Sequence, residues 1–133
     1  MKRIADWIRE NSFILIIGIL TVAYMASPLG NTRLHNGHDF SYHLLRIENI
    51  KDGLLNGQIP VRIGPLFLNH RGYGSSLFYP ELFLYIPALF RLAGFTIETS
   101  YKLFALLTIV GCFVTTYLCA KGISKDKYTA LIT

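Results

Sequence analysis

Two long apolar runs without charged residues, 12–29 and 103–120, constrain the fold of this chain more than any other feature. A helix needs about 20 predominantly apolar residues to cross the hydrocarbon core of a bilayer. Hydrophobic residues make up 52% of the 133 residues, which is more apolar surface than a soluble domain of this length buries. We therefore expect an all-α integral membrane protein with transmembrane helices at residues 12–29 and 101–120, and the lipid bilayer as its main partner.

A secretory signal peptide is the alternative interpretation of the first run, because basic residues precede it at Lys2, Arg3 and Arg9. Two observations argue against this interpretation. Pro28 makes the Ala-Ser-Pro sequence at its end a poor cleavage site, and the run is longer than a usual signal core. We expect the run to remain in the protein as a membrane anchor.

The distribution of basic residues predicts the topology, since Lys and Arg close to a span are enriched on the cytoplasmic side. Both chain ends are basic next to a span, which places residues 1–11 and 121–133 in the cytoplasm. Residues 30–100 then form an extracytoplasmic loop at the plasma (inner) membrane. Residues 128–133 resemble the start of a further hydrophobic helix. We therefore expect an N-terminal portion of a multi-pass protein, in which other membrane segments or subunits complete the fold.

Charge patterning also disfavours two classes of function. The formal net charge of +5 is spread along the chain, with no Lys/Arg-rich run interleaved with aromatic residues, so we expect no nucleic-acid partner. Neither apolar run contains a charged residue of the kind that lines transport pathways, which argues against a transporter.

Within the loop, residues 39–55 have the periodicity of an amphipathic helix. At 100° per residue, five apolar side chains fall within one arc of roughly 120°: Phe40, Leu44, Ile47, Ile50 and Leu54. The same projection places Glu48 and Asp52 on the solvent side.

A second apolar segment of the loop, residues 77–94, leaves two interpretations open. It is almost as apolar as a span, but it contains Glu81 and Arg91. Pro80 suits the first turn of a helix, whereas Pro87 would kink it. The segment either crosses the membrane or forms a kinked, interfacial or re-entrant helix. The second interpretation is favoured, because a third span would leave the Lys-rich C-terminus outside.

Asp39, His43 and Arg46 fall on a strip of the first loop helix, next to its apolar arc, and three interpretations compete for it. The strip is an ordinary solvated face with an i, i+4 contact, a divalent metal site, or a catalytic carboxylate beside an arginine that binds phosphate. Structural zinc is disfavoured, because His35, His38 and His43 match no closed zinc pattern and no cysteine is near.

The loop also contains a series of short motifs in a fixed order: Gly37-His38-Asp39, His43, Arg46, Leu55-Asn56-Gly57-Gln58-Ile59-Pro60-Val61-Arg62, Gly72-Tyr73-Gly74 and Phe78-Tyr79-Pro80. In order and spacing they resemble the first periplasmic loop of bacterial multi-span proteins of the GT-C glycosyltransferase superfamily. The similarity is greatest to those labelled pyruvoyl-tetrahydropterin synthase-related membrane proteins. It extends over residues 10–125. One departure is Glu81, where the family often has a second proline; another is length, since such enzymes have many more spans.

The resemblance implies a membrane enzyme that transfers sugar from a polyprenyl-phosphate donor, with this chain as an N-terminal portion that is inactive alone. Asp39 would be the catalytic base or help to hold a divalent cation, Mg²⁺ or Mn²⁺. The substrate phosphate would be bound by Arg46, Arg62 and Arg71, and the supporting residues would be His38 and His43.

The rival hypothesis is a small non-enzymatic integral membrane protein that acts as an interaction or assembly subunit. Small residues on the second run, Gly111, Thr115 and Thr116, would then form the face that packs against other helices.

Overall fold

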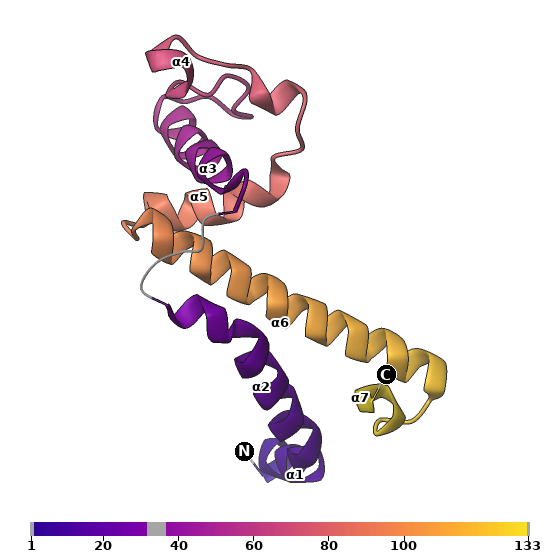
Figure 1. Cartoon of the computed structure of the whole chain (residues 1–133). Helices are drawn as coiled ribbons and strands as arrows, with labels where there is room; N and C mark the ends of the chain where they lie inside the picture. The colour runs from indigo at the N-terminus through magenta and orange to yellow at the C-terminus, as the bar shows by residue number, and fades with distance from the viewer. Residues whose placement is uncertain (1, 32–36, 133) are drawn as a thin grey trace. The chain divides into compact units, whose positions relative to one another are not determined.

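The computed structural model describes residues 2–31 and 37–132. The chain divides into two compact units (Figure 1). Unit 1 comprises residues 1–32 and 106–133, and unit 2 comprises residues 33–105. Helix α6 (Ile97–Ser124) begins in unit 2 and continues into unit 1.

The described residues are helical and contain no β-strand, apart from one isolated antiparallel bridge between Gly64 and Tyr73. Two helical segments are long and apolar enough to span a membrane, namely Ser12–Gly30 and Ile97–Ser124. The first joins α2 (Ser12–Ala26) to a short 3-10 helix, η1 (Ser27–Gly30). The expected all-α fold with two helices of spanning length is thus confirmed.

Unit 1 also contains two short helices, α1 (Lys2–Glu10) and α7 (Thr129–Ile132). Gly18 of α2 lies against the ring of Phe113, where a Cβ atom would approach the ring to 2.9 Å. The Asp126 carboxylate accepts hydrogen bonds from the backbone amides of Tyr128 and Thr129, at 3.1 and 2.7 Å, and so caps the start of α7. Those bonds, from Thr129 first, hold the pKa of Asp126 below its usual value.

Unit 2 is built on α3 (Phe40–Leu55), which packs against α5 (Tyr85–Leu92). Ile47, Ile50, Val61 and Ala88 form its buried core. Leu44 and Leu54 of α3 pack against this core, and the ring of Phe40 meets that of Tyr101 edge-on at 5.0 Å. The amphipathic arc predicted for residues 39–55 is therefore the face of α3 that is buried.

The second apolar segment forms three short helical pieces: η2 (Ser75–Leu77), η3 (Leu82–Leu84) and α5. Pro80 does not begin a helix, as the sequence suggested, but lies between helical pieces. Pro87 lies in the first turn of α5, directly after η3, where its missing amide hydrogen removes no bond of a regular α-helix. The continuous helical stretch, Leu82–Leu92, is shorter than the ~20 residues that a span requires.

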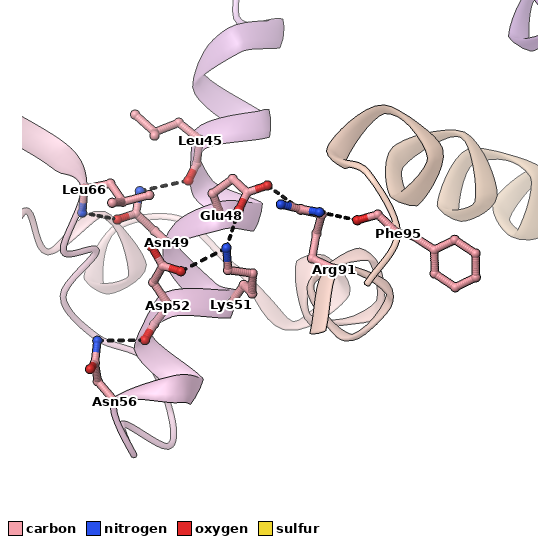
Figure 2. Close-up of polar contacts among 9 residues, drawn as sticks. All are labelled: Leu45, Glu48, Asn49, Lys51, Asp52, Asn56, Leu66, Arg91 and Phe95. Atoms are coloured by element: carbon pink, nitrogen blue, oxygen red, sulfur yellow. Dashed lines mark hydrogen bonds and ion pairs between the residues drawn. The ribbon is translucent and has the colours of Figure 1, made fainter. Parts of the chain in front are cut away.

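The expectation that Glu48 and Asp52 face solvent is also wrong. Their side chains retain only 20% and 28% exposure, because α5 and the side chain of Lys51 cover this flank of α3. The guanidinium of Arg91 donates to Glu48 and to the carbonyl of Phe95, while Lys51 donates to Glu48 at 2.9 Å (Figure 2). An ion pair thus links α3 to α5.

This ion pair predicts an acid-sensitive contact. Burial raises the pKa of Glu48, but the bonds from Arg91 and Lys51 outweigh it and hold the pKa below the ordinary value of 4.5. The stabilisation is therefore complete above that value and is lost as the pH falls through the lowered pKa. We expect the unfolding temperature of the protein to fall as the pH drops below about 4.5, and to fall less in Glu48→Gln. An equal fall in both proteins would contradict this account.

The irregular segment after α3 is fastened to that helix by one backbone and one side-chain amide. Gly57, with a φ of +75°, ends α3, and the backbone amide of Gln58 donates to the carbonyl of Gly53 at 2.9 Å. The side chain of Asn49 accepts the amide hydrogen of Leu66 at 2.7 Å and donates to its own helix (Figure 2). These bonds hold the segment after α3 alongside that helix, so that it runs back towards the N-terminal end of α3.

Candidate functional site

Asp39 lies at the start of α3 on a cavity of about 350 Å³ in unit 2. The other residues that line this cavity are Tyr42, His43, Tyr73 and Tyr79. We call it the Asp39 cavity. Asp39 is the N-cap residue of α3, but its side chain makes no capping hydrogen bond. The carboxylate is 72% exposed, with the ring of His38 3.3 Å away, and is accessible to a ligand in the cavity.

Aromatic rings from separate parts of the sequence meet at this cavity. Tyr42 is one helical position before His43, and their ring centroids lie 5.6 Å apart. The ring of Tyr79 lies 6.1 Å from that of Tyr42, and Phe67 supports Tyr42 from a further side at 5.7 Å. The cavity therefore combines an anionic group, an imidazole and the faces and hydroxyls of tyrosines.

Arg46 lies one helical turn further along α3 and is 4% exposed. Its Nε donates to Oε1 of Glu81 at 3.4 Å, and its Nη2 donates to the carbonyl of Pro80 at 3.1 Å. The guanidinium carbon lies 5.8 and 5.5 Å from the ring centroids of Tyr42 and Tyr79. Arg46 therefore holds the segment at Tyr79 against α3, and so positions a side chain that lines the Asp39 cavity.

The strip predicted on α3 thus runs from the surface into the interior. Asp39 and His43 are exposed and line the same cavity, while Arg46 lies beneath it, with its Nη1 3.5 Å from Nδ1 of His43. Because its guanidinium is occupied within the fold, direct contact between Arg46 and a phosphate stays a prediction. An ordinary solvated face, the first of the three interpretations, does not describe Arg46, which is buried.

Residue spacing predicted neither Glu81 as the partner of Arg46 nor the three tyrosines as cavity residues. Glu81 is 9% exposed, and it also accepts a bond from the hydroxyl of Ser75 at 3.3 Å. Its signal in the sequence was a carboxylate within an apolar segment, since such a group is buried only with a partner. No comparable signal separates the cavity tyrosines from the other aromatic residues of the loop.

The remaining predicted phosphate ligands, Arg62 and Arg71, are exposed, and neither lines the Asp39 cavity. Arg62 lines a second cavity of unit 2, and Arg71 follows the short helix α4 (Phe67–His70). His38 lies beside Asp39, with its Nδ1 3.3 Å from the carboxylate, and its supporting role stays a prediction. His35 lies outside the described residues.

The predicted Mg²⁺ or Mn²⁺ would need ligands from the side chains near Asp39. Among the described residues, no group of three or more His, Cys, Asp or Glu side chains gathers in a way that could hold a metal ion. Asp39 and His38 supply one carboxylate and one imidazole, whereas Mg²⁺ takes six ligands, mostly oxygens. Since this donor set does not make a cation site by itself, we derive no catalytic step through a metal.

Comparison of the chain with models of protein families, with curated proteins and with solved structures found no match. The resemblance to GT-C glycosyltransferases therefore stays a prediction that rests on the loop motifs.

Proposed function

We propose that this chain is the N-terminal portion of a membrane glycosyltransferase that takes sugar from a polyprenyl-phosphate donor, with Asp39 as the catalytic base. The observation that supports this proposal is the placement of an exposed carboxylate on a cavity lined by tyrosines and an imidazole. Tyrosine offers an apolar face and a polar hydroxyl, and a sugar ring presents both C–H groups and hydroxyls. The exposed carboxylate of Asp39 in this lining disfavours a purely apolar ligand.

In the proposed reaction the acceptor hydroxyl gives its proton to the carboxylate of Asp39 while its oxygen bonds to the anomeric carbon of the sugar. The bond between that carbon and the donor phosphate oxygen breaks, and polyprenyl phosphate leaves with the electron pair. General-base transfer of this kind contributes about 10²–10⁴-fold to a rate. His38 and His43 line or border the same cavity and orient the groups that react.

The proposed setting is the plasma membrane, with the loop on its extracytoplasmic side. Two helices of spanning length lie before and after residues 31–96 in the sequence. The segment from η2 to α5 also exposes a series of large apolar side chains that suit a position at the bilayer interface: Leu77, Phe78, Leu82, Phe83, Ile86 and Leu89. Of the three arginines predicted to bind phosphate, Arg62 and Arg71 are exposed and available to meet the donor phosphate.

The test of this function is sugar transfer by the complete protein in membranes. We expect release of polyprenyl phosphate from at least one donor in a panel of radiolabelled polyprenyl-phosphate sugars. Asp39→Asn should lower the rate by about 100-fold or more, because the amide cannot accept the proton. Asp52→Asn is the matched control on the same helix, away from the cavity, and should retain activity. Absence of transfer from every donor, or full activity of Asp39→Asn, would contradict the proposal.

A further inference from the structure

Helix α1 (Lys2–Glu10) separates apolar and charged side chains onto different faces. At 100° per residue, Ile4, Trp7 and Ile8 fall within one arc of about 100°. Charged residues fall outside this arc, namely Arg3, Asp6, Arg9 and Glu10. A short helix with a tryptophan and isoleucines on one face and charges on the other is typical of helices that lie in the plane of a bilayer interface.

The apolar face of α1 is largely uncovered. Ile4, Trp7 and Ile8 are 67%, 56% and 49% exposed. A helix of nine residues is marginal in water by itself, because isolated helices shorter than about 12–15 residues gain too little to offset nucleation. A surface that covers this apolar face would therefore stabilise α1.

The junction between α1 and α2 turns the chain aside instead of continuing one straight helix. Asn11 joins the two helices with a φ of −111° and a ψ of 10°, and Figure 1 shows α1 and α2 running in different directions. The side-chain amide of Asn11 donates to the carbonyl of Trp7 at 2.8 Å, and the hydroxyl of Ser12 donates to that of Arg9 at 3.0 Å. A straight continuation would carry Ile4 about 12 Å beyond Ser12 along the axis. In the proposed membrane setting, a helix that turns aside stays at the bilayer surface.

The same end of unit 1 carries an excess of basic residues. Lys127, on the segment after α6, donates to the backbone carbonyl of Glu10 at 3.2 Å, which brings that basic segment to the end of α1. Residues 2–10 and 121–127 together contain six basic and three acidic residues. Lys and Arg close to a bilayer are attracted to the anionic lipids of the cytoplasmic leaflet, which is the leaflet that the proposed topology gives to this end. The charge of this end thus complements an anionic lipid surface.

We propose that α1 binds the surface of an anionic bilayer, with Ile4, Trp7 and Ile8 inserted at the boundary between headgroups and acyl chains. Tryptophan is enriched at this depth, because its ring is apolar and its N–H is polar. The inference rests on the proposed membrane setting and does not depend on sugar transfer. It assigns residues 2–10, expected from the sequence in the cytoplasm, to the membrane interface.

The experiment is quenching of tryptophan fluorescence in nanodiscs of phosphatidylcholine and phosphatidylglycerol that contain the full chain. The chain has one tryptophan, so Trp7 alone reports on α1 in the parent protein. Lipids brominated near the top of the acyl chain should lower its emission by about twofold or more, because interfacial helices bury their apolar face about 5–10 Å into this boundary. Acrylamide in the water should quench it weakly. Strong quenching by acrylamide without quenching by the lipids would overturn the inference.

Moving the tryptophan around α1 tests which face meets the lipid. In a Trp7→Phe background, Ile4→Trp should be quenched by the brominated lipids, whereas Asp6→Trp, on the charged side, should be quenched by acrylamide. Equal quenching at the two positions would overturn the proposed orientation of α1. Ile19→Trp, within α2, is the control for the membrane setting and should be quenched by lipids brominated deep in the acyl chain. Lipid quenching of Ile19→Trp without that of Ile4→Trp would overturn the inference and leave the membrane setting in place, whereas no lipid quenching at either position would overturn both.

Lipid composition tests the choice of an anionic surface. At constant bromine content, replacement of phosphatidylglycerol by phosphatidylcholine should reduce the lipid quenching of Trp7 by about half, because the attraction of the basic residues is lost. Salt should have the same effect in the anionic nanodiscs, since it screens exposed charges. Equal quenching in neutral and anionic nanodiscs would contradict the role assigned to the basic residues.

Discussion

Replacement of Arg46 by methionine is expected to destabilise unit 2 by about 3–5 kcal/mol, because it leaves Glu81 as a buried charge without its cation. The side chains of Arg46 and Glu81 are only 4% and 8% exposed, so solvent screens their interaction little. The change also removes two hydrogen bonds to the carbonyls of Tyr79 and Pro80. If the segment that contains Tyr79 and Pro80 detached from α3, the Asp39 cavity would lose the side chain of Tyr79 from its lining.

Hydrogen exchange of the amides of α3, measured by mass spectrometry on the full chain, reports this loss. A destabilisation of this size accelerates exchange by roughly 100-fold or more where exchange requires unfolding of the unit. The double variant Arg46→Met with Glu81→Leu should recover much of the protection, because it removes both charges. Arg62→Met is the control at an exposed arginine. Parent-like protection in Arg46→Met alone would refute the role assigned to the ion pair.

Gly53→Val is the second substitution expected to have a large effect on unit 2. A Cβ atom at Gly53 would lie 2.5 Å from one methyl of Val61 and 2.7 Å from the other. Val61 is 2% exposed and belongs to the core, so neither side chain can turn away into solvent. Overpacking of this kind costs about 1–3 kcal/mol and sometimes more.

The Gly53→Val effect can be measured as a lower unfolding temperature and as faster exchange of the α3 amides. Gly37→Ala is the matched control in the same unit, because the nearest atom to its added Cβ is 3.8 Å away, an ordinary contact. In the double variant Gly53→Val with Val61→Ala, the smaller side chain at position 61 makes room for the new valine. This variant should therefore recover part of the lost stability. A Gly53→Val protein as stable as the parent would show that α3 does not pack on Val61 as closely as described.

Sequence periodicity predicted the helices well where one physical effect determines the structure. The apolar runs became helices of spanning length, since their composition leaves few alternatives. The spacing from Phe40 to Leu54 identified the buried face of α3, because a helix repeats its faces regularly.

Periodicity failed where a distant segment determines the surroundings of a residue. Glu48 was expected to face solvent, but α5 brings Arg91 to it across 43 residues of sequence. The pairing of Arg46 with Glu81 likewise joins residues 35 apart. A helical projection contains no information on such contacts, so it could place Arg46 on a strip but could not tell that the strip enters the interior.

The candidate site was predicted only at its centre. Asp39 and His43 were expected on one strip, and they line the same cavity. Tyr73 and Tyr79 reach that cavity through the irregular segment after α3, whose course depends on backbone hydrogen bonds such as that from Gly64 to Tyr73. Loop courses of this kind follow from tertiary contacts rather than from residue spacing.

We propose that unit 2 presents Asp39 on the extracytoplasmic side of a membrane, between two spans. Single-cysteine accessibility in intact cells tests this topology, in a background from which Cys112 and Cys119 have been removed. Cysteines are placed at Ser41 and Thr99 in unit 2 and at Lys125 after α6, all of which are exposed. The account predicts that an impermeant reagent labels the first two in intact cells, and the third only after permeabilisation. Labelling of Lys125 from outside, or protection of Ser41, would contradict it.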